Sequence, residues 1–190
     1  MTVFLYILWL VSIPYATIPL FWLTIHPFAD RWRAKRGRVM PLVIVCWVGC
    51  WVLAGVATWP LMPERVHTTY LSWLPALICF FAGTRIYRGI SKDFDRPKVI
   101  GQAELKPGEH EQKLVVSGMH GRMRHPFYAA HLLMLTGFTL GGGLKAQVVL
   151  LGSALLTGWF MLRSEERELE QRFGDAYREY RKTVPALRFY

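Results

Sequence analysis

The sequence predicts an all-α integral membrane protein with about five transmembrane helices, and three observations lead to this fold class. Hydrophobic residues make up 53% of the 190-residue chain, and its mean hydropathy is +0.23. The apolar residues are gathered in runs long enough to cross a bilayer as helices. The formal net charge of +10 is concentrated between these runs, as expected when basic loops stay on the cytoplasmic side.

The predicted spans are apolar runs that alternate with polar segments. The first run has no basic segment before it, which favours a retained membrane helix over a cleaved signal peptide. His26 and Pro27 end this first span, and His26 is expected to be an interface or loop residue. The helical pattern continues past the last span, and a short helix at 176–182 follows it. The five spans cover approximately residues 3–23, 41–62, 70–87, 126–140 and 144–162.

The basic segments predict an outside N-terminus and a cytoplasmic C-terminus. Residues 30–38, interpreted as a cytoplasmic loop, hold five basic side chains and one acidic side chain. Residues 88–124 hold eight basic and five acidic side chains. Both segments follow the positive-inside rule. We expect a single membrane domain over 1–190, made of a three-span part, a cytoplasmic segment and a helical hairpin with its tail, at 1–90, 91–125 and 126–190.

The composition also argues against other classes of protein. Basic charge between membrane runs favours contact with the lipid bilayer, and we expect no nucleic-acid partner. All three cysteines fall inside apolar runs and show neither disulfide nor zinc spacing. Gly141-Gly142-Gly143 lacks the preceding strand and the following Lys-Ser/Thr of a phosphate loop, so it predicts a tight turn between two helices.

The last two spans predict a site where their cytoplasmic ends meet. About 16 residues, or roughly 24 Å of helix, separate Pro126 from the glycine turn. Counting the same distance back along the fifth span ends six residues before Glu165, which therefore lies roughly 9 Å beyond that level. Glu165 and Glu166 should thus lie close in height to Arg124 and His125.

Both signs of charge are present at this predicted site. Pro126 suits the first position of a helix, whose free N–H groups, beside Arg124 and His125, favour an anion. The two glutamates opposite favour a cation. A ligand that carries both signs fits such a site, and S-adenosylmethionine has a carboxylate, an ammonium and a sulfonium. An ion pair between Arg124 and Glu165 accounts for the same charges without a ligand.

A longer pattern covers approximately the last 80 residues. The ordered set resembles the isoprenylcysteine carboxyl methyltransferase family, as a prokaryotic-type member, and its wider group with the membrane phospholipid methyltransferases. The first three spans carry no recognisable signature. The pattern consists of Leu114-Val115-x-x-Gly118, Arg124-His125-Pro126-x-Tyr128, Glu165-Glu166-x-x-Leu169-x-x-x-Phe173-Gly174-x-x-Tyr177-x-x-Tyr180 and Val184-Pro185.

The resemblance implies an integral membrane methyltransferase that uses S-adenosyl-L-methionine without a Rossmann domain. The cofactor pocket would be cytoplasmic, formed by the last two spans and the C-terminal helices. The methyl acceptor would be lipid-like or a small hydrophobic molecule, methylated at a carboxylate, a thiol or an amine. Leu169, Phe173 and Tyr177 are expected to dock the tail over the site. The implied location is the bacterial inner membrane, with the active site facing the cytoplasm.

Carried over to this sequence, the resemblance implies three sets of site residues. The catalytic set is Arg124, His125, Glu165 and Glu166. The cofactor-binding set is Gln112, Lys113, Leu114, Val115, Gly118, His120, His125, Pro126, Tyr128 and Glu165. The substrate-binding set is His131, Met161 and Arg163, where a structural hydrogen bond is an equal alternative for His131. No metal site is expected, because His125 and His131 lie about 240° apart around a helix.

Two departures from the family pattern concern the substrate. His120 stands where the family usually has Tyr. Met161 stands where the prenylcysteine enzymes have an Arg for the substrate carboxylate, and Arg163 lies about 160° further round the helix. These differences put a prenylcysteine substrate in doubt. The alternative function is a non-catalytic membrane protein on the same scaffold, which binds haem or a partner subunit through its histidines.

Overall fold

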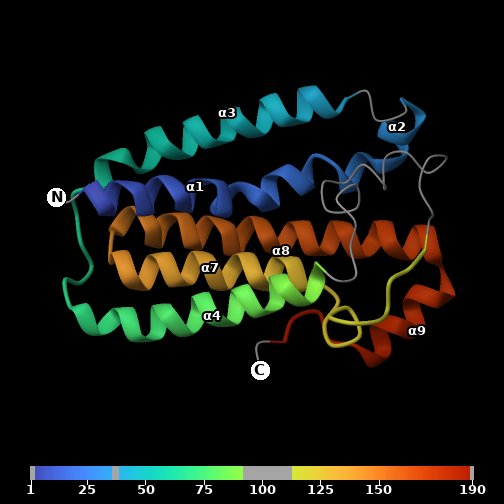
Figure 1. Cartoon of the computed structure of the whole chain (residues 1–190). Coiled ribbons are helices and arrows are strands. Elements are labelled where there is room, and N and C mark those ends of the chain that lie inside the picture. Colours follow the sequence, from blue (N-terminus) through green and yellow to red (C-terminus); the bar gives the residue numbers. More distant parts are fainter. Residues whose placement is uncertain (1–2, 36–38, 92–112, 189–190) are drawn as a thin grey trace.

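The computed structural model describes residues 3–35, 39–91 and 113–188, and over these residues the protein is a bundle of helices. Figure 1 shows α3 and α1 on one side of the central α7 and α8, and α4 on the other side. The described residues form no β-strand, and an isolated antiparallel bridge pairs Arg65 with Leu144. The five long helices are α1 (Val3–Leu23), α3 (Met40–Thr58), α4 (Trp73–Ile90), α7 (Pro126–Gly142) and α8 (Lys145–Phe173).

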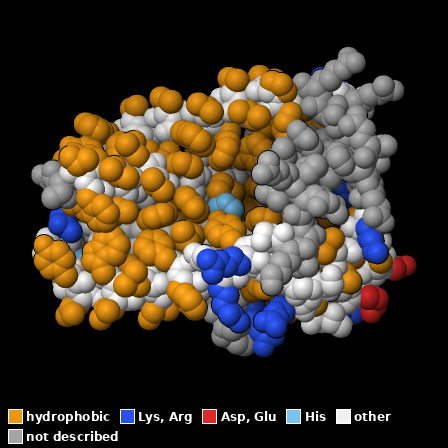
Figure 2. All heavy atoms as spheres, viewed as in Figure 1, with side chains coloured by type: hydrophobic (Ala, Val, Ile, Leu, Met, Phe, Trp, Pro, Cys, Tyr) orange, Lys and Arg blue, Asp and Glu red, His pale blue; other side chains and the backbone are white. Residues whose placement is uncertain are grey.

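Within the described residues, three helices are long and apolar enough to cross a membrane. They are α1 with its continuation to Ala34, α3 with the short helix η2 (Trp59–Leu61), and α8. Figure 2 shows hydrophobic side chains over most of the visible face, with basic side chains gathered mainly below the bundle and towards its α9 end. The prediction of a membrane protein is therefore supported for three helices, whereas α4 and α7, with 18 and 17 residues, are not among them.

The core forms where α1 crosses the hairpin of α7 and α8. Its buried side chains come from all three helices, and α4 packs along the other side of α7. Two hydrogen bonds join polar groups of different helices inside this apolar bundle: Trp9 Nε1 donates to Thr58 Oγ1 at 3.0 Å, and Gln147 Nε2 donates to Ser12 Oγ at 3.1 Å. These bonds join distant helices without placing an unpaired charge in the membrane layer.

The glycine turn between α7 and α8 is confirmed, and the structure explains why glycine is needed there. Gly143 has φ +63° and its N–H donates to the Thr139 carbonyl, which ends α7. Its own carbonyl accepts a hydrogen bond from the Val66 N–H at 2.8 Å, so the loop after η2 runs closely past the turn. A Cβ at residue 143 would lie 2.6 Å from the His67 carbonyl oxygen.

The predicted loop at 30–38 is wrong in its first half. The segment after α1 forms a 3-10 helix, η1 (His26–Phe28), and a short α-helix, α2 (Ala29–Ala34). Two local bonds stabilise this fold-back: the Arg33 guanidinium pairs with Asp30 at 2.8 Å, and Trp32 Nε1 donates to the Thr24 carbonyl at 2.7 Å. Part of the basic charge that predicts a loop thus lies on the short helix α2, at the end of the bundle (Figure 1).

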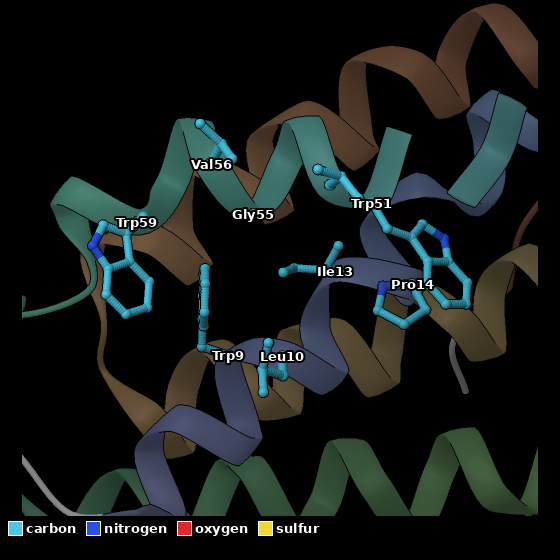
Figure 3. A pocket seen from close by; sticks show the side chains of 9 residues that line it. Trp9, Leu10, Ile13, Pro14, Trp51, Gly55, Val56 and Trp59 are labelled. Atoms are coloured by element: carbon cyan, nitrogen blue, oxygen red, sulfur yellow. The ribbon is translucent and has the colours of Figure 1, made fainter. Parts of the chain in front are cut away.

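A groove lies between α1 and α3, and Figure 3 shows its aromatic walls. Its volume is about 530 Å³, and no charged side chain lines it. Such a space suits hydrocarbon and offers no group for acid–base or charge chemistry. The lining residues are Trp9, Leu10, Ile13, Pro14, Trp51, Val52, Gly55, Val56 and Trp59.

Candidate functional site

The start of α7 and the part of α8 around Glu165 and Glu166 meet at one end of the bundle, as the helix lengths predicted. Pro126 occupies the first turn of α7, and His125 is its N-cap residue. The N–H groups of Arg124 and His125 donate to the carbonyls of Pro185 and Ala186, at 2.9 and 3.1 Å. The segment after α9 (Asp175–Thr183) therefore pairs with the chain just before α7 and closes this end of the hairpin.

His125 lies between two carboxylates. Its side chain is buried, with Nδ1 3.0 Å from Glu165 Oε2 and Nε2 3.1 Å from Glu166 Oε1. Burial lowers the pKa of the His125 imidazole, but the Glu165 carboxylate and then the Glu166 carboxylate outweigh this and raise it to about 9. His125 is therefore an imidazolium at neutral pH. The Nδ1 contact is an ion pair without hydrogen-bond alignment.

Arg124 acts as a clamp between α8 and the C-terminal segment. Its Nε donates to Glu166 Oε1 at 2.9 Å, and its Nη1 donates to the Val184 carbonyl and, at 3.3 Å, to the Arg181 carbonyl. The partner of Arg124 is thus Glu166, and not Glu165 as in the ligand-free alternative drawn from the sequence. Glu165 keeps its second oxygen for other contacts. The catalytic role expected for Arg124 stays a prediction, and its contacts are structural.

A second ionic cluster, missed in the sequence, centres on the buried Glu168. It pairs with Arg33 of α2, with Arg172 Nη1 at 3.6 Å and with His26 Nδ1 at 4.0 Å. His26 lies just past the end of α1, where an interface or loop residue was expected, but its side chain is buried and stacks on Trp22. A signal existed in the spacing: Glu165, Glu168 and Arg172 share one helical face at intervals of three and four.

Several buried polar atoms at this end have no hydrogen-bond partner among the residues that the structure describes. An unbonded buried polar atom costs about 1–3 kcal/mol, so a group of them indicates a place for a polar ligand or water. The charge of His26 also acts on Glu165, which connects the two ionic clusters. The atoms are His26 Nδ1, His125 Nδ1, Glu168 Oε2, Arg172 Nε and the Tyr177 hydroxyl.

The helix α9 covers this end as a lid of aromatic side chains. Tyr177 and Tyr180 pack with residues of α8 and with the segment before α7, and the Tyr180 hydroxyl donates to the His120 carbonyl at 2.6 Å. The docking stripe predicted for the tail is confirmed by this packing. The cluster consists of Tyr177, Tyr180 and Val184 with Leu114, Leu169 and Phe173.

The expected cofactor-binding residues fall into three environments. Gln112 lies outside the described residues, and Lys113 to Val115 form an irregular segment in which Leu114 packs against α9. Gly118, with φ +56°, turns the chain, and the half-buried His120 follows. Pro126 and Tyr128 are buried, and the Tyr128 hydroxyl donates to the Ala154 carbonyl at 2.8 Å, inside the hairpin. Their cofactor roles stay predictions.

The three expected substrate-binding residues do not come together. Met161 is buried, with 3% of its surface exposed. Arg163 is exposed, and its guanidinium lies 4.1 Å over the Trp159 ring, so it belongs to the outer surface of α8. His131 lies six residues beyond His125, and its Nδ1 is 2.7 Å from the Phe127 carbonyl oxygen. The described residues contain no group of three or more potential metal ligands.

Part of the chain is similar to the Delta(14)-sterol reductase TM7SF2 of Mus musculus, with 32% identity over 120 residues. The similar region covers 57% of this chain and 28% of the reductase, so the chain spans less than a third of that relative. No family model matches the sequence, and no solved structure matches it. The apolar helices support a membrane protein and the relative is an enzyme, but neither finding identifies methyl transfer.

Proposed function

We propose that the protein is a membrane-embedded methyltransferase that binds S-adenosyl-L-methionine beside His125 and Glu165. The observation that carries this proposal is the buried imidazolium held between two carboxylates, with unbonded polar atoms around it. These residues also belong to the motif that resembles the isoprenylcysteine carboxyl methyltransferase family. Burying charged side chains costs desolvation energy, and such clusters are more common at functional sites than elsewhere. The burial of His125 and its two carboxylate partners therefore favours a ligand site over a purely structural ion pair.

The charges of the site suit this cofactor. Glu165 and Glu168 offer carboxylate oxygens to an ammonium or a sulfonium, and His125 orients Glu165 through the ion pair. The imidazolium also balances the cofactor's own carboxylate. When bound, the cofactor supplies an electrophilic methyl group. The chain's part is then to hold donor and acceptor in line and to exclude water, which the α9 lid does for the cytoplasmic side.

The acceptor is proposed to be a lipid-like or small hydrophobic molecule that reaches the site from the bilayer. Arg163 does not replace the missing arginine at Met161, because it stacks on Trp159 at the outer surface of α8. A carboxylate substrate of the prenylcysteine kind would therefore lack its counter-ion here. Of the expected acceptor groups, this leaves a thiol or an amine better supported than a prenylcysteine carboxylate.

We also propose that α4 and α7 cross the membrane with the other three long helices. The N-terminus is then outside, and the site at the start of α7 faces the cytoplasm, in the inner membrane of a bacterium. Arg85 and Arg88 near the end of α4 support this orientation, because basic residues stay on the cytoplasmic side. The hairpin also supports a membrane-crossing α7. A short turn joins α7 to α8, so if α8 crosses the bilayer, α7 crosses it in the opposite direction.

A second candidate is a reductase, favoured by the similarity to the sterol reductase of Mus musculus. Reduction of a carbon–carbon double bond needs a hydride donor and an acid, and the His125 imidazolium is a suitable acid. A nicotinamide dinucleotide is the usual hydride donor, and it carries several phosphates. Glu165, Glu166 and Glu168 are already paired with His125, Arg124 and Arg33, so their charges do not decide between the two cofactors. The methyltransferase is the first choice because the motif around these residues resembles a methyltransferase family.

Ligand binding to the purified protein in detergent decides between these functions. We expect S-adenosylhomocysteine to raise the melting temperature saturably, and Glu165→Gln to weaken this binding more than tenfold. Glu179→Gln, which removes an exposed carboxylate of α9, is the matched control and should bind normally. Stabilisation by NADPH alone would point to the reductase. A Soret band without binding of either nucleotide would favour the non-catalytic haem protein.

A further inference from the structure

Three polar aromatic side chains meet where α1, α4 and α7 pack together, near the C-terminal end of α4. The His131 ring of α7 lies 5.5 Å from the Tyr15 ring of α1 and 5.3 Å from the Tyr87 ring of α4. We call Tyr15, Tyr87 and His131 the membrane polar cluster. Each side chain is half-buried, so the cluster is not sealed inside the core.

The two ring nitrogens of His131 differ in their hydrogen bonding. Nδ1 lies 2.7 Å from the Phe127 carbonyl oxygen, which can only accept, so Nδ1 carries the proton and donates. In the neutral ring Nε2 then holds a lone pair, and the hydrogen bond that the His131 ring makes within the described part of the chain is the one of Nδ1. The half-buried ring thus presents Nε2 as an acceptor for a donor from outside the bundle.

The cluster therefore offers an acceptor at Nε2 beside donors on the tyrosine hydroxyls. A hydroxyl group complements this set, because it donates through its hydrogen and accepts through its oxygen. A carboxylate has no hydrogen to donate to Nε2. Within the described residues, the aromatic and hydrogen-bonded neighbours of the three rings are one another, the Phe127 carbonyl and the Phe138 ring, and none of these groups is charged.

An apolar surface continues from the cluster towards the other end of α7. The ring centroids of Tyr15 and Phe138 are 5.5 Å apart, and those of Phe138 and Phe80 are 5.0 Å apart. Phe138 lies seven residues beyond His131, about 10 Å along the helix. A polar point beside an apolar aromatic surface matches a lipid with a single hydroxyl head and a hydrocarbon tail.

The position of the cluster connects it to the proposed cofactor site. His131 follows His125 by six residues, about 9 Å towards the membrane along α7. A lipid that enters from the bilayer meets the cluster before it reaches His125 and Glu165. We propose that Tyr15, Tyr87 and His131 bind the hydroxyl group of a lipid alcohol on its way to the cofactor site, which adds a hydroxyl to the acceptor groups proposed above. This inference rests on the proposed methyltransferase and adds Tyr15 and Tyr87 to the site.

The test compares farnesol, an isoprenoid alcohol, with farnesyl methyl ether in nanodiscs that contain the full chain. The ether keeps the tail but lacks the donor hydrogen. We expect farnesol to bind about tenfold more tightly than the ether. In protein labelled with ¹⁵N-histidine, farnesol should shift the Nε2 resonance of His131, and the ether should not. Equal affinities, or an Nε2 resonance that does not move with farnesol, would overturn the proposal.

Two variants separate binding from packing. His131→Asn keeps an N–H for the Phe127 carbonyl but removes the Nε2 acceptor, so it should keep the melting temperature and lose the preference for farnesol. Tyr87→Phe should weaken the binding of farnesol and of the ether alike, because the oxygen of each ligand accepts a hydrogen bond from the tyrosine hydroxyl. Binding of S-adenosylhomocysteine is measured in the same samples. If wild type binds the nucleotide but does not distinguish alcohol from ether, this inference fails alone; if it binds no nucleotide, the proposed function fails.

Discussion

The charge state of His125 makes the stability of the protein depend on pH in a defined window. The ion pairs with Glu165 and Glu166 raise the pKa of this imidazole from 6.5 to about 9 in the folded protein. Because the folded state holds the proton more tightly than the unfolded state, the stabilisation is fully present below pH 6.5. It decreases as the pH rises towards 9 and is absent above that value.

The size of the effect follows from the two pKa values. A difference of about 2.5, at roughly 1.4 kcal/mol for each tenfold change in proton affinity, gives about 3 kcal/mol. For a chain of this length, a loss of 1 kcal/mol in the free energy of unfolding lowers the melting temperature by about 2–4 °C. The melting temperature should therefore fall by roughly 6–12 °C between pH 6 and pH 9.5. The measurement is thermal unfolding in detergent, followed by tryptophan fluorescence, in buffers matched for ionic strength.

The control variant is His125→Asn, which keeps a polar side chain at the N-cap of α7 but cannot titrate. We expect it to be less stable than wild type at pH 6, and to lack the pH-dependent decrease between 6.5 and 9. If the wild-type melting temperature is flat over this window, or falls equally in the variant, the ion-paired imidazolium is refuted. The His125 ring can also be titrated directly by NMR in wild type, which does not depend on how well the variant folds.

Two further predictions concern packing and the second ionic cluster. A Cβ at residue 158 would overlap the Tyr128 hydroxyl, so Gly158→Ala should destabilise the hairpin by about 1–3 kcal/mol in thermal unfolding. Gly152→Ala on the same helix meets nothing within 4 Å and should be nearly neutral. Arg33→Met should lower stability by about 3 kcal/mol, because the buried Glu168 loses a partner, and Glu168→Gln in that background should recover part of the loss. Additive effects of the Arg33 and Glu168 changes would contradict their pairing.

The membrane helices and the meeting of the hairpin ends could be predicted because they depend on local sequence. The first span at 3–23 has the same bounds as α1, since an apolar run is visible in the sequence without knowledge of its neighbours. The approach of His125 to Glu165 followed from the rise per residue of two helices joined by a short turn. The choice between Glu165 and Glu166 as the partner of Arg124 did not follow, because it depends on side-chain direction.

The contacts between distant segments could not be predicted. Arg33 and Glu168 are separated by 135 positions, and nothing in either local sequence indicates that they pair. Basic charge between two apolar runs predicts a cytoplasmic loop, whereas Arg33 neutralises a buried carboxylate. The membrane polar cluster combines residues of three helices, so its existence also depends on the fold.

The pairing of residues 184–186 with the chain before α7 determines when the site can form during synthesis. Arg124 and the Val184 carbonyl are 60 positions apart, and the α9 lid lies between them in the sequence. The membrane helices emerge from the ribosome first, and His125 and Glu165 are both present before Val184 has been added. Until the later segment folds back, however, the Arg124 clamp lacks its carbonyl partners. A nascent chain therefore has its apolar helices before this end of the hairpin is closed.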